Sequence, residues 1–453
     1  MNAVKSVAVI LLACLCGCSS IKNSMSSFTG GEDNTIPPTP LEKFTPTLSV
    51  DKLWEKSIGD GTDKQYLKLE PAYSDDRIYV ADSDGEVTSL DAKTGKTVWK
   101  QDIDTRITGG PGIGDNLVVV GTGEAEVYAL DQNSGEVVWK VTVSSEILSA
   151  PKISDKIVIV RTIDGKLFGL NVTDGSRLWT YDRAVPALTL RGTSAPVISD
   201  GVVIAGFDEG RLTAVDLSTG KLIWETRIAY GTGRSELERM VDIDAQPVIY
   251  AGYIYVATFQ GRIAAVDLES GRIQWTRDIS SFTDIAVDDN AVYLTSDKSE
   301  VWALERLSGN SIWKQDKLLY RSASGPAILD QTVVVGDLEG YVHWLDKLSG
   351  KIVGRSKLTD SRIIATPVAS DGVLYVYASD GTLAAYSYDQ SYVATPAPVE
   401  ENTTEPAADE TTAKPESDNN STEQPADSEK SKDEDDEPHG LIEWLWRKVK
   451  QKD

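Results

Sequence analysis

The chain has 453 residues and a formal net charge of −25. This charge excludes nucleic acid as a main partner, because binding a phosphate backbone requires a basic surface. All three cysteines lie within the first eighteen residues, so the folded part of the chain has neither disulfides nor thiolate metal sites.

The first residues have the layout of a secretory signal. Lys5 precedes an apolar run over residues 7–15 that is too short to span a bilayer, and small residues follow it. The sequence Leu-Cys-Gly-Cys that ends at Cys18 resembles a bacterial lipobox, which implies a signal peptide over 1–17, a lipid on Cys18 and an anchor in the outer membrane. Residues 18–50, rich in Ser, Thr, Pro and Gly, are expected to form a flexible tether. The alternative is an ordinary cleaved signal followed by a free cysteine.

A repeated unit fills most of the remaining chain. Between Leu212 and Trp224 it reads as Asp, then Ser-Thr-Gly, then a Trp four residues after the Gly, which predicts two short strands joined by a turn at Gly220. The same Gly-to-Trp interval recurs at Gly95/Trp99, Gly135/Trp139, Gly175/Trp179, Gly220/Trp224, Gly271/Trp275 and Gly309/Trp313. A further copy at Gly350 has Gly354 in the Trp position. Periods near 40 residues are typical of four-stranded propeller blades.

The two ends of the repeat region complete each other. Trp54 has no hairpin before it, and the strand that begins at Gly381 has no Trp strand after it. A ring pairs a first strand with a last one. We therefore predict an all-β protein, an eight-bladed β-propeller of four-stranded blades over residues 51–390, closed by pairing an N-terminal strand with the last blade. The repeated Trp is expected to fill the gap between neighbouring blades.

Two connections that flank one blade are long. From the Trp of one unit to the Pro that opens the next there are 12 residues at Trp99 to Pro111 and at Trp139 to Pro151, and 13 at Trp313 to Pro326, but 17 from Trp179 to Pro196 and 23 from Trp224 to Pro247. Both insertions join a fourth strand to the next first strand, so both are expected on one rim, flanking one blade. Insertions in repeat proteins commonly map to the binding face. We expect a surface there with exposed leucines, an arginine and two aspartates.

Residues for catalysis are scarce. The only histidines are His343, in an alternating strand, and His439, in an acidic region, so neither a His-based metal site nor a Ser–His pair can be assembled. The segment from Asp82 resembles a calcium loop, but Lys93 stands where the bidentate Glu is needed. The Gly-rich run 109–114 precedes a strand rather than a helix, as a blade entrance does. We expect no enzyme activity, no cofactor and no metal.

The C-terminal region differs in composition. Residues 391–437 contain 15 acidic and 3 basic residues, which predicts a disordered acidic linker. Within 438–453, Leu441, Leu445 and Val449 share one helical face, which predicts a short amphipathic helix that lies in a membrane interface or docks in a partner's groove. The alternative is a frayed terminus with no partner.

The repeat resembles that of pyrroloquinoline-quinone-type propellers. Within that superfamily the lipobox, the eight blades and the segments LTLRGTSAPV, VDID and GDLEGYVHWLD are similar to the BamB family, the lipoproteins of the outer-membrane β-barrel assembly machinery. The resemblance covers roughly residues 15–389. It implies a non-enzymatic scaffold that binds the periplasmic POTRA domains of BamA and helps β-barrel outer-membrane proteins to insert. The partner-binding residues that it implies are Leu188, Leu190, Arg191, Asp242 and Asp244.

Two other functions share these features. A quinone-dependent dehydrogenase uses the same repeat, but it needs a calcium and cofactor site on the ring axis, and the adjacent cysteine pair that many such enzymes carry is absent. A polysaccharide-binding propeller is the second alternative. For Asp242 and Asp244 the sequence leaves three roles open: pairing with basic groups of a partner, holding the loop, or capping turns.

Overall fold

The computed structural model describes residues 36–62, 65–184, 186, 194–389 and 391–395, and one compact unit begins at Pro38. The expected signal peptide, Cys18, nearly all of the acidic linker and the terminal helix lie outside the described residues. In the described ranges, no helix has both the length and the apolar character needed to cross a membrane.

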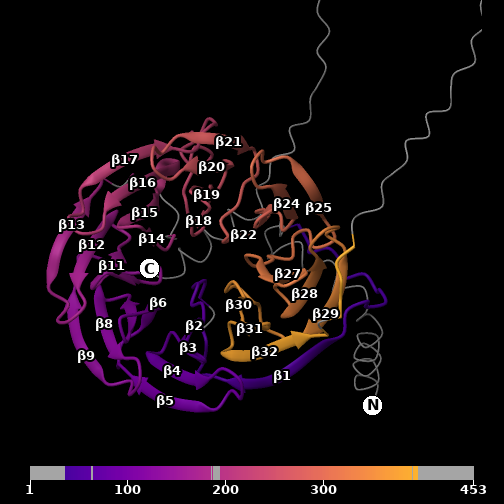
Figure 1. The fold of residues 1–453 in the computed structure, drawn as a ribbon, viewed down its shortest axis with the longest axis horizontal. Helices are drawn as coiled ribbons and strands as arrows, with labels where there is room; N and C mark the ends of the chain where they lie inside the picture. The colour runs from indigo at the N-terminus through magenta and orange to yellow at the C-terminus, as the bar shows by residue number, and fades with distance from the viewer. Residues whose placement is uncertain (1–35, 63–64, 185, 187–193, 390, 396–453) are drawn as a thin grey trace, which may run out of the picture. The chain divides into compact units, whose positions relative to one another are not determined.

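Eight four-stranded antiparallel sheets are arranged as blades around a ring, which confirms the predicted architecture (Figure 1). Blade 1 contains β2 (Ala72–Ser74), β3 (Arg77–Ala81), β4 (Glu86–Asp91) and β5 (Thr97–Asp102). Blade 2 contains β6 (Ile107–Gly114), β7 (Leu117–Thr122), β8 (Glu126–Asp131) and β9 (Val137–Thr142). Blade 3 contains β10 (Lys152–Ser154), β11 (Ile157–Arg161), β12 (Lys166–Asn171) and β13 (Arg177–Asp182). Blade 4 contains β14 (Val197–Ser199), β15 (Val202–Phe207), the 3-10 turn η1 (Asp208–Gly210), β16 (Arg211–Asp216) and β17 (Leu222–Arg227).

The second half of the ring repeats this order. Blade 5 contains β18 (Val248–Tyr250), β19 (Tyr253–Ala257), β20 (Ile263–Asp267) and β21 (Ile273–Arg277). Blade 6 contains β22 (Ala286–Val287), β23 (Ala291–Thr295), β24 (Val301–Glu305) and β25 (Ser311–Gln315). Blade 7 contains β26 (Ala327–Leu329), β27 (Thr332–Gly336), β28 (Tyr341–Asp346) and β29 (Ile352–Lys357). Blade 8 contains β30 (Val368–Ser370), β31 (Val373–Tyr377), β32 (Thr382–Tyr388) and the N-terminal β1 (Val50–Ser57).

The ring closes at blade 8 as predicted. β1 pairs antiparallel with β32, from Val50 opposite Tyr388 to Ser57 opposite Thr382. The first strand of each blade lies nearest the ring axis, and each contacts the first strand of the next blade, including β30 with β2 (Figure 1). The Gly-rich run 109–114 lies within β6 rather than before it, which corrects its expected position.

The repeat unit works across the boundary between blades. Trp179 of blade 3 donates its indole N–H to the carbonyl of Leu217 in blade 4 at 2.8 Å, and its ring covers Gly220, where a Cβ atom would overlap it. Gly220 has a φ of +67°, which an L side chain rarely adopts. The other Trp–Gly pairs of this kind are Trp54–Gly95, Trp99–Gly135, Trp139–Gly175, Trp224–Gly271, Trp275–Gly309 and Trp313–Gly350. The Gly of each repeat therefore receives the Trp of the preceding one, and the expected gap-filling role of Trp is confirmed.

The boundary between blades 7 and 8 is the exception. Blade 8 has no hairpin between its last two strands, because they come from opposite ends of the chain, and so it offers no Gly to receive a Trp. Blade 7 carries Gly354 on its outer strand and Trp344 opposite it on β28, so the large and small residues have exchanged strands. Leu48, which is 4% exposed, fills the remaining space beside Gly354 and donates its N–H to Val353 O at 3.1 Å.

Residues 38–48, which we call the N-terminal strap, therefore pack against the propeller, although the sequence predicts a flexible tether there. Thr39 donates its N–H to Leu319 O at 3.0 Å, and Leu41 packs into the core between blades 6 and 7. The packed unit thus begins at Pro38, about twelve residues before β1. Residues 18–35 of the predicted tether lie outside the described residues.

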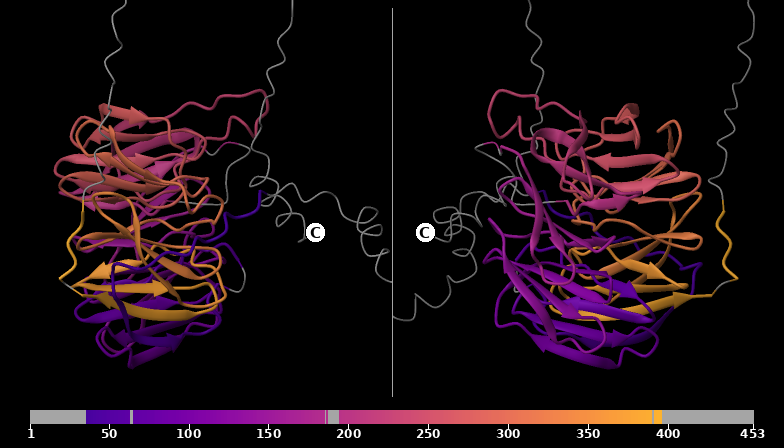
Figure 2. Two further views of the ribbon diagram at one scale, coloured as in Figure 1. Left: turned by 90° about the vertical axis from the view of Figure 1, so that its right-hand side faces the viewer. Right: turned by 60° about the vertical axis from the view of Figure 1, so that its left-hand side comes forward.

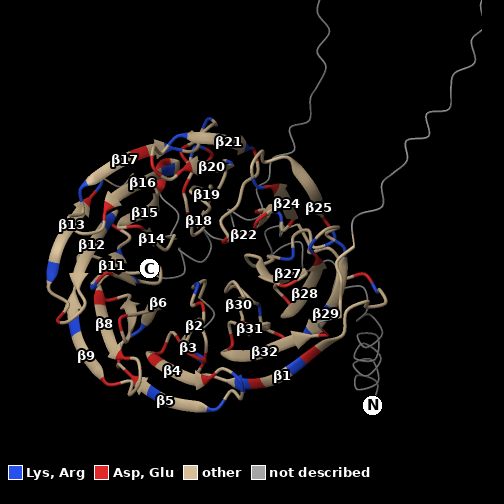
Figure 3. Cartoon of the chain, in the orientation of Figure 1, with Lys and Arg blue, Asp and Glu red and all other residues tan. Residues whose placement is uncertain are grey.

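The connections fall on two rims. Links from a fourth strand to the next first strand share one rim with the turns between second and third strands, and we call this the long-loop rim. The hairpins that contain the repeat Gly lie on the opposite rim, the hairpin rim. In the left view of Figure 2 the rose-coloured loop between blades 4 and 5 and the indigo strap lie toward one side, whereas the yellow segment after β32 lies toward the other. Charged residues of both signs are spread over the outer strands and turns (Figure 3).

Candidate docking site on the long-loop rim

Two long connections flank blade 4 on one rim, as the sequence predicts, and the connection from β1 to β2 over residues 58–71 is as long as the first of them. The first, called loop 1, joins β13 to β14 over residues 183–196, and the second, called loop 2, joins β17 to β18 over residues 228–247. Leu188, Leu190 and Arg191 of loop 1 lie outside the described residues. The described part of the site is therefore loop 2, the two ends of loop 1, and the residues of blades 3 to 5 beneath them.

The tip of loop 2 is exposed and internally braced. Ser235 and Glu238 form a reciprocal pair, in which the Ser235 N–H donates to the Glu238 carboxylate at 3.0 Å and the Glu238 N–H donates to Ser235 Oγ at 3.2 Å. This is the hydrogen-bond pattern of a capping box. Arg239 donates to the Arg234 carbonyl at 3.2 Å, and Tyr230 at the base of the tip is 69% exposed. The tip thus presents a preformed surface to solvent.

The base of loop 2 is buried, and this corrects the expected exposure of its aspartates. Asp242 is 3% exposed and Asp244 is 7% exposed, while Ile243 between them is 1% exposed. The Asp242 carbonyl accepts the Phe259 N–H at 2.9 Å and its carboxylate accepts the Glu209 N–H at 3.3 Å. These two hydrogen bonds connect the segment to blade 4 and to blade 5. Of the three roles left open, the structure supports that of holding the loop.

A polar cluster near the axis holds the other side of this base. Lys68, on the segment that leads from β1 to β2, donates to the carbonyls of Asp244 at 3.2 Å and Phe282 at 2.7 Å. Its ammonium also lies 3.9 Å from Asp284, which accepts the Gln246 N–H at 2.7 Å. Loop 2 is thereby connected to the first and sixth blades. No local pattern predicts this cluster, because Lys68 is 176 residues from Asp244 and 214 residues from Phe282 along the chain.

Three acids in this region have shifted pKa values. Burial, the neighbouring Asp284 carboxylate and a hydrogen bond with it raise the pKa of Glu70 to about 8, so Glu70 is largely protonated at neutral pH. Burial opposes ionisation of Asp284 as well. The positive charge of Lys68 and the hydrogen bonds that the Asp284 carboxylate accepts nevertheless hold the pKa of Asp284 below its ordinary value. Burial also raises the pKa of Asp244 to about 6, against the opposing effect of Lys68 and Arg161.

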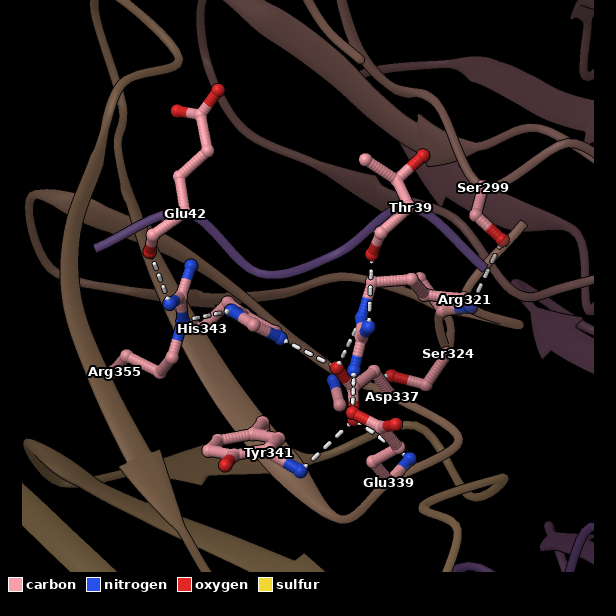
Figure 4. A network of polar contacts seen from close by, with 12 residues as sticks. Thr39, Glu42, Ser299, Arg321, Ser324, Asp337, Glu339, Tyr341, His343 and Arg355 are labelled. Carbon is pink, nitrogen blue, oxygen red and sulfur yellow. Dashed lines mark hydrogen bonds and ion pairs between the residues drawn. The ribbon is translucent and has the colours of Figure 1, made fainter. Parts of the chain in front are cut away.

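His343 belongs to a structural network at the strap (Figure 4). Its Nδ1 accepts a hydrogen bond from Arg355 Nε at 3.1 Å, so its Nε2 carries the proton and donates to Asp337 at 2.9 Å. Arg321 donates to Asp337 at 2.8 Å and to the Thr39 carbonyl at 3.0 Å. Burial holds the pKa of His343 below its ordinary value, which keeps the ring neutral. This histidine therefore helps to hold the N-terminal strap.

The segment that resembles a calcium loop is also structural. Asp82 is 2% exposed, and its Oδ1 accepts the N–H groups of Asp84 and Gly85 at 3.1 Å and of Glu86 at 2.9 Å. These bonds close the turn before β4. In the part of the chain that the structure describes, no group of three or more His, Cys, Asp or Glu residues is arranged to hold a metal ion.

The fold and this rim define a class of protein: a PQQ-type repeat propeller with a long, internally braced loop on one rim. A family profile described as "Outer membrane protein assembly factor BamB" matches residues 51–111, 83–315 and 316–393. The chain belongs to the BamB family.

Relatives with this name support the assignment. The chain is 43% identical to the assembly factor BamB of Pseudomonas aeruginosa over 374 residues, which cover 82% of this chain and 96% of that one. It is 35% identical to BamB of Escherichia coli over 366 residues, 78% of this chain and 92% of that one. These relatives are named as assembly factors and not as enzymes, and the chain is accordingly not an enzyme.

Solved structures agree on the fold. The crystal structure of BamB from Moraxella catarrhalis superimposes with a TM-score of 0.69 at 28% identity, covering 75% of this chain and all of that one. A quinohemoprotein alcohol dehydrogenase from Pseudomonas putida reaches a TM-score of 0.60 at 13% identity, covering 77% of each chain. The second likeness shows a shared propeller fold and carries no argument for quinone chemistry.

The Glu70–Asp284 pair generates a pH prediction. Because the pKa of Glu70 is raised on folding, the folded chain binds more protons than the unfolded chain between the ordinary glutamate pKa and about 8, and stability falls as pH rises through that window. Glu70→Gln keeps the neutral shape. We expect its thermal midpoint to match that of the parent protein near pH 5 and to exceed it near pH 9. Glu236→Gln on the exposed tip is the control, and parallel pH curves for parent and Glu70→Gln would contradict the assignment.

Proposed function

We propose that the chain is the component of the outer-membrane β-barrel assembly machinery that docks on the POTRA domains of BamA and assists insertion of β-barrel proteins. The observation that carries this proposal is the pair of long loops that flank blade 4 on one rim. The exposed, braced tip of loop 2 offers a surface that needs little ordering on binding, which lowers the entropic cost of association. Relatives at 35% to 44% identity are named as outer membrane protein assembly factors.

The roles proposed for individual residues follow from their chemistry. Leu188 and Leu190 supply an apolar anchor, and Arg191 forms charge-assisted hydrogen bonds to carbonyl or acidic groups of BamA. Asp242 and Asp244 act indirectly, because their burial lets them hold the base of loop 2 rather than meet a partner. We also propose that Cys18 carries a lipid, which places the propeller on the periplasmic face of the outer membrane.

The docking role of loop 1 is tested with Leu190→Ala and Arg191→Ala. Each should weaken binding to the purified POTRA domains of BamA by about 2 kcal/mol, roughly 30-fold, since central anchors of interfaces commonly cost this much on truncation. The measurement is a titration followed by calorimetry. Leu307→Ala is the matched control, because Leu307 is 67% exposed on the hairpin rim. If both loop 1 variants are folded and bind with the parent affinity, the interface lies elsewhere.

The lipid anchor is tested with Cys18→Ser in cells. Loss of the Cys18 thiol removes the atom to which the lipid of a lipobox cysteine is attached, so the variant should move from the membrane fraction to the soluble periplasmic fraction. Mass spectrometry of the parent protein should find acyl groups on Cys18. A parent protein without acyl groups, together with unchanged fractionation of the variant, would refute the anchor.

A further inference from the structure

One position at the end of the second strand is occupied by a different kind of residue in blade 3. In every blade this residue pairs with the first apolar residue of the third strand, as Arg161 does with Leu167. The residues at this position, in blade order, are Ala81, Gly121, Arg161, Gly206, Ala257, Thr295, Gly336 and Tyr377. Seven are uncharged and most are small. The blade fold therefore does not require an arginine at this position, and we looked for another role for the buried Arg161.

Arg161 reaches from blade 3 to the end of loop 1. Its side chain is 3% exposed, and its Nη1 donates to the Ser194 carbonyl at 3.2 Å and to Ser194 Oγ at 3.1 Å. The guanidinium also lies 4.8 Å from the centre of the Phe207 ring at the end of β15. These contacts fix both its plane and its position, as hydrogen bonds and stacking commonly do for arginine.

The charge of the same guanidinium acts on acids that belong to blade 4 and loop 2. Asp208, Asp244 and Asp242 all interact electrostatically with Arg161. A buried carboxylate is costly unless a cation compensates it, and Arg161 acts against the effect of burial on the pKa values of Asp208 and Asp244. Arg161 thus contacts loop 1 directly at Ser194, and it contacts Phe207, whose backbone carbonyl accepts a hydrogen bond from Ile243 of loop 2.

The two loops also meet sterically at one glycine. A Cβ atom on Gly206 would overlap Ile243 of loop 2 and would lie 2.9 Å from Ser194 Oγ of loop 1. Ile243 donates its N–H to the Phe207 carbonyl at 3.3 Å. The residue that Arg161 holds in loop 1 and the residue between the two acids of loop 2 therefore pack on the same spot of β15.

We propose that Arg161 is a positioning residue that couples loop 1 to loop 2, so that the two loops are presented to the partner as one surface. The proposal rests on the proposed docking function. Arg161 does not contact the partner. It sets the position of Ser194 on one side and of the Asp242–Asp244 segment on the other, and it links three successive blades at the rim.

The test is Arg161→Ala, which places in blade 3 the residue that blades 1 and 5 already carry at this position. We expect the ring to fold, as checked by near-ultraviolet circular dichroism. Hydrogen–deuterium exchange of the lipid-free protein should speed up at least tenfold in peptides that contain Ser194 and in peptides that contain residues 241–244. Binding to the purified POTRA domains of BamA should weaken at least tenfold.

The matched control is Thr295→Ala. Thr295 occupies the equivalent position in blade 6 and donates to the Ser324 carbonyl at 2.8 Å, which is the same kind of bond to a connection between blades. It flanks a short connection, so exchange in both long loops and affinity should stay at the parent values. Arg161→Lys, which keeps the charge but not the planar fork, should restore part of the protection of residues 241–244 and part of the affinity.

The outcomes separate the coupling from the docking function. If residues 241–244 of Arg161→Ala exchange at the rate of the parent protein, the proposed coupling between the loops is wrong, whatever the affinity of the variant for the POTRA domains. Faster exchange in both loops with unchanged affinity would overturn the role of the coupling in docking. If Leu190→Ala and Arg191→Ala bind normally, the proposed docking surface fails, while the exchange measurement still decides whether Arg161 joins the loops.

Discussion

The contact between a tryptophan of one blade and a glycine of the next is the constraint on which this structure depends. Each indole donates to a backbone carbonyl and covers a glycine of the next blade. Only glycine readily adopts the positive φ found there, and a Cβ atom at this position would overlap the indole ring. This Trp–Gly contact sets the distance and the angle between neighbouring sheets along their outer strands. Because it lies in the outer half of the blades, the connections on the long-loop rim can lengthen without disturbing the ring. That freedom is what allows blade 4 to carry two long loops.

The repeat makes much of this fold predictable. The Gly-to-Trp interval predicted the blades, and the unpaired Trp54 predicted closure with the strand after Gly381, because both are consequences of a local pattern repeated around a ring. The spacing of Pro196 and Pro247 predicted two long loops on one rim. Gly354 already marked an irregular boundary in the sequence, but the compensation by Trp344 and Leu48 involves residues from both ends of the chain and leaves no local pattern.

The site was predictable only in outline. The expected exposure of Asp242 and Asp244 was wrong because burial depends on what covers a segment, and here the cover comes from Lys68, Glu209 and other distant residues. Arg161 could have been found in the sequence by aligning the ends of the second strands, where the other seven blades carry uncharged residues. The clearest signal for function was therefore a departure from the repeat rather than the repeat itself.

The N-terminal strap begins on the long-loop rim, where the long loops lie, and leads to the start of β1, which pairs with the end of β32 on the hairpin rim. Thr39 is held by Arg321 on the long-loop rim, and the Tyr392 hydroxyl donates to Asp346 at 2.6 Å on the hairpin rim. The most direct test of the account is photo-cross-linking in native membranes from a reactive residue placed at Tyr230 or at Leu307, which are 69% and 67% exposed on opposite rims. The account predicts cross-links to BamA from position 230 and none from position 307. Equal cross-linking from both positions, or cross-linking from 307 alone, would contradict it.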